Sequence, residues 1–234
     1  MEPKSVALIG ISRKSGPGSF NVMENMITYG YRGRIFPVNP KAREILGRKV
    51  YPAITSVKEE VDLAVISTPR ENTLSIIEDC VAARVKAAIL VNQGYADADD
   101  EGKKIQQEVV EIARRGGMRV LGPNTLGVLN NFNDFTTSFM PTTKDRTPVG
   151  LICQSGIFFV GAEEFSGTIG KGIDLGNACD VGFYDALRYL GEDPDIKIIA
   201  VHMEGSSQAR DFVSLAARVA KEKPIILLKT GSSE

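Results

Sequence analysis

A glycine-rich stretch near the start of the sequence contains the residue types that bind phosphate groups. An apolar run at residues 6–9 leads into this stretch, and a helical pattern that ends at Gly30 follows it. The stretch itself contains Gly10, Ser12, Arg13, Lys14, Ser15 and Gly16. Glycine lets the backbone approach an anion closely, and a helix N-terminus offers unpaired N–H groups and the positive end of a dipole. The order of strand, glycine loop and helix therefore predicts a phosphate-binding site.

The spacing of the glycines distinguishes this loop from two common nucleotide-binding motifs. Gly10, Gly16 and Gly18 do not form Gly-x-Gly-x-x-Gly, and no Gly-Lys-Ser/Thr closes the loop. The second predicted strand ends in Asn39 and Lys41, where an NAD site would carry an acid for the ribose. This difference favours a nucleotide-type ligand with an additional phosphate. For the stretch considered alone, a turn that is merely rich in glycine remains the alternative.

Composition and charge argue against several classes of protein. Lys plus Arg number 28 against 29 for Asp plus Glu, so the net charge of −1 gives no support for nucleic acid or a membrane surface as the main partner. Cys80, Cys153 and Cys179 lack the spacing of a metal site or a disulfide framework, which fits a reducing compartment. No apolar segment of signal-peptide or membrane-span length is present in the sequence. We therefore expect a cytoplasmic protein.

The elements that must position the glycine loop alternate regularly along the first half of the chain. Apolar runs predict strands at residues 6–9, 34–41, 61–66, 87–91 and 118–121. Helical patterns lie between them, and the first places Phe20, Met23 and Ile27 on one face. Such alternation predicts an α/β fold with a doubly wound parallel sheet and right-handed crossovers.

Four loops should meet at one edge of this sheet. Ligands of open parallel sheets bind outside the carboxyl ends of the strands. The loops that follow four of the predicted strands are residues 10–18, 39–41, 67–69 and 92–94. We expect them to converge on one crevice.

The second half of the chain repeats the alternation after a less regular segment. Residues 129–147 are rich in Asn, Thr and Pro, and are interpreted as a connection between a domain at 1–128 and another at 148–234. Strands are predicted at residues 148–153, 171–175, 196–201 and 225–229. The first helix of this half should carry Phe158, Phe159, Ala162 and Phe165. The last strand lacks a following helix, so we expect another chain or further sequence to complete this domain.

A set of short motifs in this order resembles the CoA-binding domain of NDP-forming (ADP-forming) acyl-CoA synthetases, the group that includes succinyl-CoA synthetase α subunits. The resemblance covers nearly the whole chain. It rests on Gly10–Lys14, Tyr29–Pro40, Gly122-Pro123-Asn124, Gln154-Ser155-Gly156, Leu175-Gly176-Asn177, Glu192-Asp193-Pro194, Glu204-Gly205 and Lys229-Thr230-Gly231. It implies a Rossmann-like CoA-binding domain followed by a flavodoxin-like ligase domain, with coenzyme A as the bound group.

The resemblance also implies roles for particular residues. The loop 12–16 with Lys41 would hold the phosphates of CoA, and Asn39 and Asn124 would belong to the same site. The adenosine and pantetheine would lie against Ser67, Thr68, Pro69, Asn92, Gln93 and Gly94. Ser155 and Gly156 would present a helix N-terminus to phosphate, and Glu204 would orient a phosphorylated histidine.

One departure from the family pattern leaves the activity of this chain open. The family carries its phosphoryl group on a histidine beyond the Lys-Thr-Gly strand, whereas the one histidine here is His202. A histidine at a strand end is more often structural than a phosphoryl carrier. The chain is therefore expected to work with an ATP-grasp domain or subunit, in an oligomer, as part of a ligase. A CoA-binding regulatory module is the alternative, and an NAD(P)-dependent oxidoreductase is a weaker one.

Three other features could carry chemistry but have simpler explanations. The acidic run at residues 97–101 is expected to be a helix start, where carboxylates favour the dipole, rather than a metal site. Cys153 lies in an apolar strand, which favours a buried thiol over a nucleophile. The sequence around Ser155 is similar to a nucleophile elbow, Gly-x-Ser-x-Gly, but the first glycine is missing and no histidine is placed to complete a catalytic triad.

Overall fold

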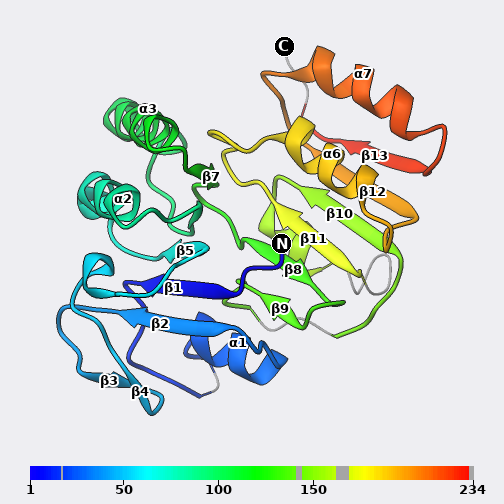
Figure 1. The fold of residues 1–234 in the computed structure, drawn as a ribbon. Coiled ribbons are helices and arrows are strands. Elements are labelled where there is room, and N and C mark those ends of the chain that lie inside the picture. The colour runs from blue at the N-terminus through cyan, green and yellow to red at the C-terminus, as the bar shows by residue number, and fades with distance from the viewer. Residues whose placement is uncertain (17, 141–143, 162–168, 232–234) are drawn as a thin grey trace.

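The computed structural model describes residues 1–234 except 17, 141–143, 162–168 and 232–234. Two β-sheets, each built mainly of parallel strands, account for the two halves of the chain (Figure 1). The N-terminus lies between the two sheets, near the strands of the second (Figure 1). None of the described helices is both long and apolar enough to cross a lipid bilayer.

The first sheet contains five parallel strands in the order β2-β1-β5-β6-β7. Its strands are β1 (Ser5–Ile9), β2 (Arg34–Val38), β5 (Leu63–Ile66), β6 (Ala87–Leu90) and β7 (Arg119–Leu121). From β1 the chain adds β2 on one side and then β5, β6 and β7 on the other, so the order reverses between β1 and β5. Such a reversal opens a crevice at the carboxyl ends of the two strands. The predicted doubly wound sheet is confirmed.

Both faces of this sheet are covered, which explains why its strands are largely apolar. Helices α2 (Thr73–Ala82) and α3 (Asp100–Arg115) lie side by side on one face (Figure 1). Ile77 and Val109 from these helices pack with Ala7 and Ile9 of β1. The other face packs against helix α1 (Val22–Tyr29) and residues of the second sheet. Short elements complete this half: β3 (Glu44–Ile45), β4 (Arg48–Lys49), η1 (Ile54–Ser56) and η2 (Arg70–Asn72).

Of the three residues predicted to share one face of the first helix, Met23 and Ile27 lie in α1, whereas Phe20 precedes it. Helix α1 begins only at Val22, because the side chain of Asn21 accepts hydrogen bonds from the N–H groups of Met23 and Glu24 and caps the helix. Met23 and Met26 are fully buried, whereas Phe20 is 57% exposed and Ile27 is 40% exposed. The predicted end was right, since Gly30 adopts the left-handed conformation at the C-cap.

The second sheet has six strands in the order β13-β12-β10-β11-β8-β9. Its strands are β8 (Val128–Asn130), β9 (Phe135–Thr136), β10 (Val149–Cys153), β11 (Lys171–Asp174), β12 (Ile198–Met203) and β13 (Ile225–Lys229). The last four are parallel, while β8 and β9 join antiparallel. Residues 128–136, most of which were expected in a connection, therefore contribute two strands to this sheet.

Three described helices accompany the second sheet: α4 (Gly156–Val160), α6 (Phe183–Glu192) and α7 (Ala209–Val219). Phe158 and Phe159 lie in α4 as predicted, and Ala162 and Phe165 lie outside the described residues. Strand β13 is the edge strand, and its side chains are mostly exposed, with Ile226 at 65%.

Candidate functional site

The carboxyl ends of β1 and β5 touch where the strand order reverses. Gly10 has φ +78°, and a Cβ built on it would lie 2.5 Å from Thr68 Cγ2 and 2.8 Å from the Ser67 carbonyl oxygen. A side chain at position 10 is therefore excluded both by the backbone angle and by contact. Among the described residues, the buried hydroxyl of Thr68 has no hydrogen-bond partner. An unpaired buried polar group beside a crevice fits a missing ligand contact.

Several backbone groups of the glycine loop are hydrogen-bonded within the protein. The N–H of Lys14 donates to Ser12 Oγ, and that of Gly16 donates to both carboxylate oxygens of Glu24, at 3.0 and 2.9 Å. The side-chain amide of Asn21 donates to the carbonyls of Ser12 and Lys14. These contacts hold the loop in shape and occupy two of the amides that the sequence suggested for phosphate. The side chains at 12–15 all remain exposed.

Asn39 and Lys41 lie beside this loop, at the end of β2. The Asn39 side chain donates to the carbonyl of Ile11, and its Oδ1 accepts from the Lys41 N–H at 2.9 Å. Both residues line a cavity of about 520 Å³ together with Gly10 and Thr68. The structure thus brings the loops after β1, β2 and β5 together, as the sequence predicted.

Hydrogen bonds connect the loop after β6 to the loops after β5 and β7. Asn92 donates to the carbonyl of Thr68, and its own backbone carbonyl accepts from the N–H of Asn124, which follows β7. Gln93 is exposed, and Pro69 is exposed at the start of η2. Four of the predicted binding loops therefore share one edge, with Asn124 beside them.

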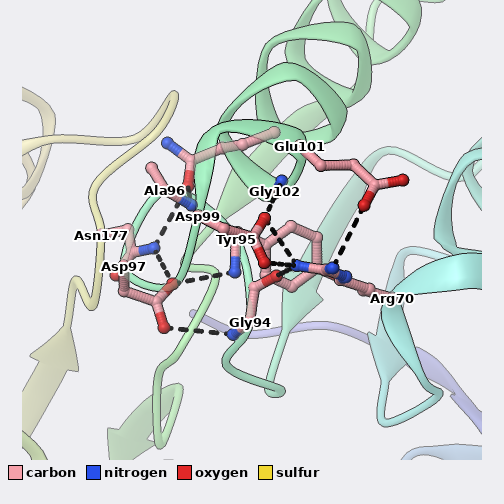
Figure 2. Close-up of polar contacts among 10 residues, drawn as sticks. Arg70, Gly94, Tyr95, Ala96, Asp97, Asp99, Glu101, Gly102 and Asn177 are labelled. Atoms are coloured by element: carbon pink, nitrogen blue, oxygen red, sulfur yellow. Dashed lines mark hydrogen bonds and ion pairs between the residues drawn. The ribbon is translucent and has the colours of Figure 1, made fainter.

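The acidic run beyond this loop, residues 97–101, takes part in a network of hydrogen bonds and ion pairs (Figure 2). Asp97 accepts from the N–H groups of Gly94 and Tyr95, and from Asn177 of the second half of the chain. Asp99 caps α3 and pairs with Arg70, which also donates to the Gly94 carbonyl at 2.8 Å. The carboxylates thus act at a helix start, as expected, and fix the 94–97 turn between the two halves.

Three cavities follow one another along the carboxyl edge and share lining residues. The cavity at Lys41 and a second one of about 350 Å³ share Ile9 and Gly10. The second cavity shares Val91 and Phe139 with a third, of about 680 Å³. The third is lined by Gly156 and reaches the second sheet. An elongated ligand could therefore extend from Lys41 past Gly10 to Gly156.

The second sheet also reverses its strand order, between β10 and β12. Gln154, directly after β10, accepts hydrogen bonds at its Oε1 from the N–H groups of Glu204 and Gly205, at 2.9 and 3.0 Å. Ser155 and Gly156 follow at the start of α4 and are partly exposed. Ser155, Gly156 and Glu204 therefore follow the carboxyl ends of two adjacent strands, β10 and β12, and Gln154 connects the two segments.

Asp174 was missed by sequence reasoning, because it ends an apolar strand without a recognisable motif. Its side chain is buried and accepts from the N–H of Leu126 at 2.7 Å. It lines the third cavity beside Gly156. Burial raises the pKa of this carboxyl above its usual value. Burial also raises the pKa of the neighbouring Cys153 thiol, with the Asp174 charge adding to it, which supports the structural role predicted for this cysteine.

His202 is buried and packed, which does not suit a carrier of the phosphoryl group. It is 3% exposed, its ring stacks on Phe158 with centroids 3.8 Å apart, and its Nε2 lies 2.9 Å from Thr230 Oγ1. Burial lowers the pKa of His202, while the charge of Glu204 acts in the opposite direction. These contacts fit a neutral structural imidazole.

The titration of His202 is directly observable, because the sequence contains one histidine. We expect its imidazole NMR signals to titrate below the ordinary value of about 6.5. Because the folded-state pKa is lowered, the unfolded chain binds the proton more tightly than the folded chain. The contribution of neutral His202 to folding stability is therefore complete above about pH 6.5 and is lost as the pH falls through the folded pKa. A His202→Asn variant should lose this part of the pH dependence of unfolding. A midpoint above 6.5 would contradict the packing described here.

Comparison with protein families and known proteins agrees with this architecture. Residues 4–131 match the model of the CoA binding domain, and residues 146–234 match that of the succinyl-CoA ligase like flavodoxin domain. The chain is 40% identical over 242 residues to the α subunit of acetate–CoA ligase [ADP-forming] I from Pyrococcus furiosus, covering 99% of this chain and 52% of that one. It is 38% identical to acetate–CoA ligase [ADP-forming] II from Archaeoglobus fulgidus, covering 35% of it.

A solved structure shows the same fold. The dinucleotide forming acetyl-coenzyme A synthetase 1 of Ca. Korarchaeum cryptofilum, in complex with phosphate and ADP, superposes with a TM-score of 0.90 at 34% identity, over 98% of this chain and 50% of that chain. This chain thus spans between a third and about half of the relatives it matches. The resemblance drawn from the sequence motifs is confirmed. The chain belongs to the CoA-binding domain family, and its second half carries a succinyl-CoA ligase like flavodoxin domain.

Proposed function

We propose that this chain is the CoA-binding part of an NDP-forming acyl-CoA synthetase, which converts acyl-CoA, ADP or GDP, and phosphate into the acid, CoA, and ATP or GTP. The observation that carries the proposal is the row of cavities from Lys41 past Gly10 to Gly156. It suits a ligand with a phosphorylated nucleotide at one end and a reactive thiol at the other. The relatives described as ADP-forming acetate–CoA ligases support the reaction class.

In this proposal each predicted residue keeps a defined role. The exposed side chains of the loop 12–16 and Lys41 bind the phosphates of CoA, with Asn39 holding Lys41 in place. The middle of the ligand lies along 67–69 and 92–94, close to Asn124 and the unpaired hydroxyl of Thr68. Gly10 allows the close contact between the ends of β1 and β5 that forms one wall of the site.

The phosphoryl chemistry would take place at the crevice of the second sheet. Ser155 and Gly156 would bind phosphate, and Glu204 would orient a phosphohistidine supplied from outside this chain, since His202 is buried and stacked. An ATP-grasp domain or partner subunit would hold the nucleotide, and the complex would be an oligomer. A reducing, cytoplasmic setting suits the three free cysteines.

Calorimetric titration of the purified chain with CoA, dephospho-CoA and NAD tests the proposal. CoA should bind with micromolar affinity, dephospho-CoA should bind more weakly, and NAD should not bind. Binding of NAD without CoA would replace the proposal by a dinucleotide-binding function.

Replacing Lys41 with alanine should weaken CoA binding by about tenfold, because a charged contact to phosphate is lost. The affinity for dephospho-CoA should change much less if Lys41 contacts the 3′-phosphate. Lys58→Ala removes an exposed lysine outside the three cavities and serves as the matched control. Equal losses in both lysine variants would indicate a general charge effect instead of a contact.

A further inference from the structure

An aromatic pair joins the two halves of the molecule at the middle of the site. Phe20 precedes the cap of α1, has φ +50° and is 57% exposed. Its ring meets that of Phe139 edge to face, with centroids 6.0 Å apart. A positive φ is uncommon and costly for a bulky residue such as phenylalanine, and at Phe20 it accompanies a largely exposed ring. Such a combination at a ligand site points to a function.

The local helix does not explain this position of Phe20. A hydrophobic residue just before an N-cap usually packs on the fourth residue of its own helix. In α1 that residue is Asn25, which is polar and instead donates to the carbonyl of Ser138 at 3.0 Å. Ser138 Oγ closes a tight turn with both the N–H and the carbonyl of Met140, and Phe139 lies at the tip of this turn. Asn25 thus places Phe139 opposite Phe20.

The pair lies where two cavities of the site meet. Phe20 and Phe139 both line the cavity of about 350 Å³ beside Gly10 and Asn92. Phe139 also lines the cavity of about 680 Å³ that contains Gly156. A ligand that extends from the 350 Å³ cavity into the 680 Å³ cavity would therefore lie against Phe139, with Phe20 beside it in the smaller cavity.

We propose that Phe20 and Phe139 form an aromatic clamp on the pantetheine arm of CoA and so position its thiol at the second sheet. This inference rests on the proposed function. The arm is uncharged and carries methylene, methyl, hydroxyl and amide groups, and aromatic rings can contact its apolar groups with their faces and edges. Because each ring comes from a different half of the chain, the clamp exists only when the two halves are packed together.

Binding measurements on the intact chain separate this role from a structural one. CoA is compared with adenosine 3′,5′-bisphosphate, which contains the nucleotide end and lacks the arm. Phe20→Ala and Phe139→Ala should each weaken CoA binding by about fivefold, the scale of one aromatic contact, and should leave the bisphosphate affinity unchanged. Phe20→Tyr keeps the ring and should restore CoA binding. Ile27→Ala, an exposed apolar residue of α1, is the control.

The double variant adds a further criterion. Since both rings would contact one segment of ligand and each other, their effects should not be additive. Equal loss of both ligands in the alanine variants, or no loss of CoA, would overturn the clamp while leaving the proposed function intact. If the wild-type chain binds the bisphosphate but not CoA, or neither ligand, the proposed function fails and the clamp fails with it.

Discussion

Replacing Gly10 with alanine is expected to abolish measurable CoA binding and to destabilise the fold by about 3 kcal/mol. The backbone at Gly10 has φ +78°, which a residue with a Cβ adopts only with strain. The new methyl group would also lie 2.5 Å from Thr68 Cγ2 and 2.8 Å from the Ser67 carbonyl oxygen. Relief of this contact must separate β1 from β5, and the crevice between them is the centre of the proposed site.

Gly18 provides a matched control for the strain alone. It has φ +76°, and a Cβ built on it would meet no atom within 4 Å. Gly18→Ala should therefore cost only about 1 kcal/mol and should retain CoA binding. Urea unfolding and calorimetric titration of both variants measure the two effects. Similar behaviour of the two variants would show that strain, and not the contact between the strands, decides the outcome.

Replacing Asp180 with alanine is expected to cost about 3 kcal/mol of folding stability at neutral pH. The side chain of Asp180 is 0% exposed and accepts from Arg114, Arg119 and the N–H of Val120, at 2.8, 2.8 and 2.9 Å. Asp180 follows the second-sheet strand β11, whereas its partners belong to α3 and β7. Its loss would leave the Val120 N–H without its partner at the junction of the two halves.

The effect of Asp180 should depend on pH in a defined direction. Burial alone would raise the pKa of Asp180, but the hydrogen bonds from Arg119, Val120 and Arg114 together hold it below the usual value. A carboxyl with a lowered folded pKa stabilises the protein fully above its unfolded pKa of about 4, and this is lost as the pH falls further. The difference in unfolding free energy between wild type and Asp180→Ala should therefore shrink below about pH 4.

Glu101→Ala is the control for charge removal. Its side chain is 76% exposed and lies 3.5 Å from Arg70, so its loss should cost at most about 0.5 kcal/mol. Denaturant unfolding of the three proteins at neutral and acid pH gives both quantities. A pH-independent cost of the Asp180 change would show that packing, and not the carboxylate, matters at this position.

The sequence by itself determined the order of elements and the edge at which the site lies. Strands buried on both faces are continuously apolar, and the polar loops at 39–41, 67–69 and 92–94 follow them directly. Parallel strands place all such loops at one edge, so their convergence followed from the pattern alone. The glycines at 10 and 30 could likewise be assigned, because the backbone angle each requires is local.

Only the tertiary structure decided which groups are free to act. Periodicity placed Phe20 on one face of the first helix, but the Asn21 cap starts α1 beyond it, and the ring lines the cavity that Phe139 also lines. The loop amide of Gly16 looked available for phosphate and is instead bound to Glu24. The contacts between the two sheets and the burial of Asp174 depend on residues that are distant in sequence, and no local pattern encodes them. Local sequence patterns therefore indicate the edge of the sheet at which a ligand would bind, whereas long-range packing determines which side chains are accessible there.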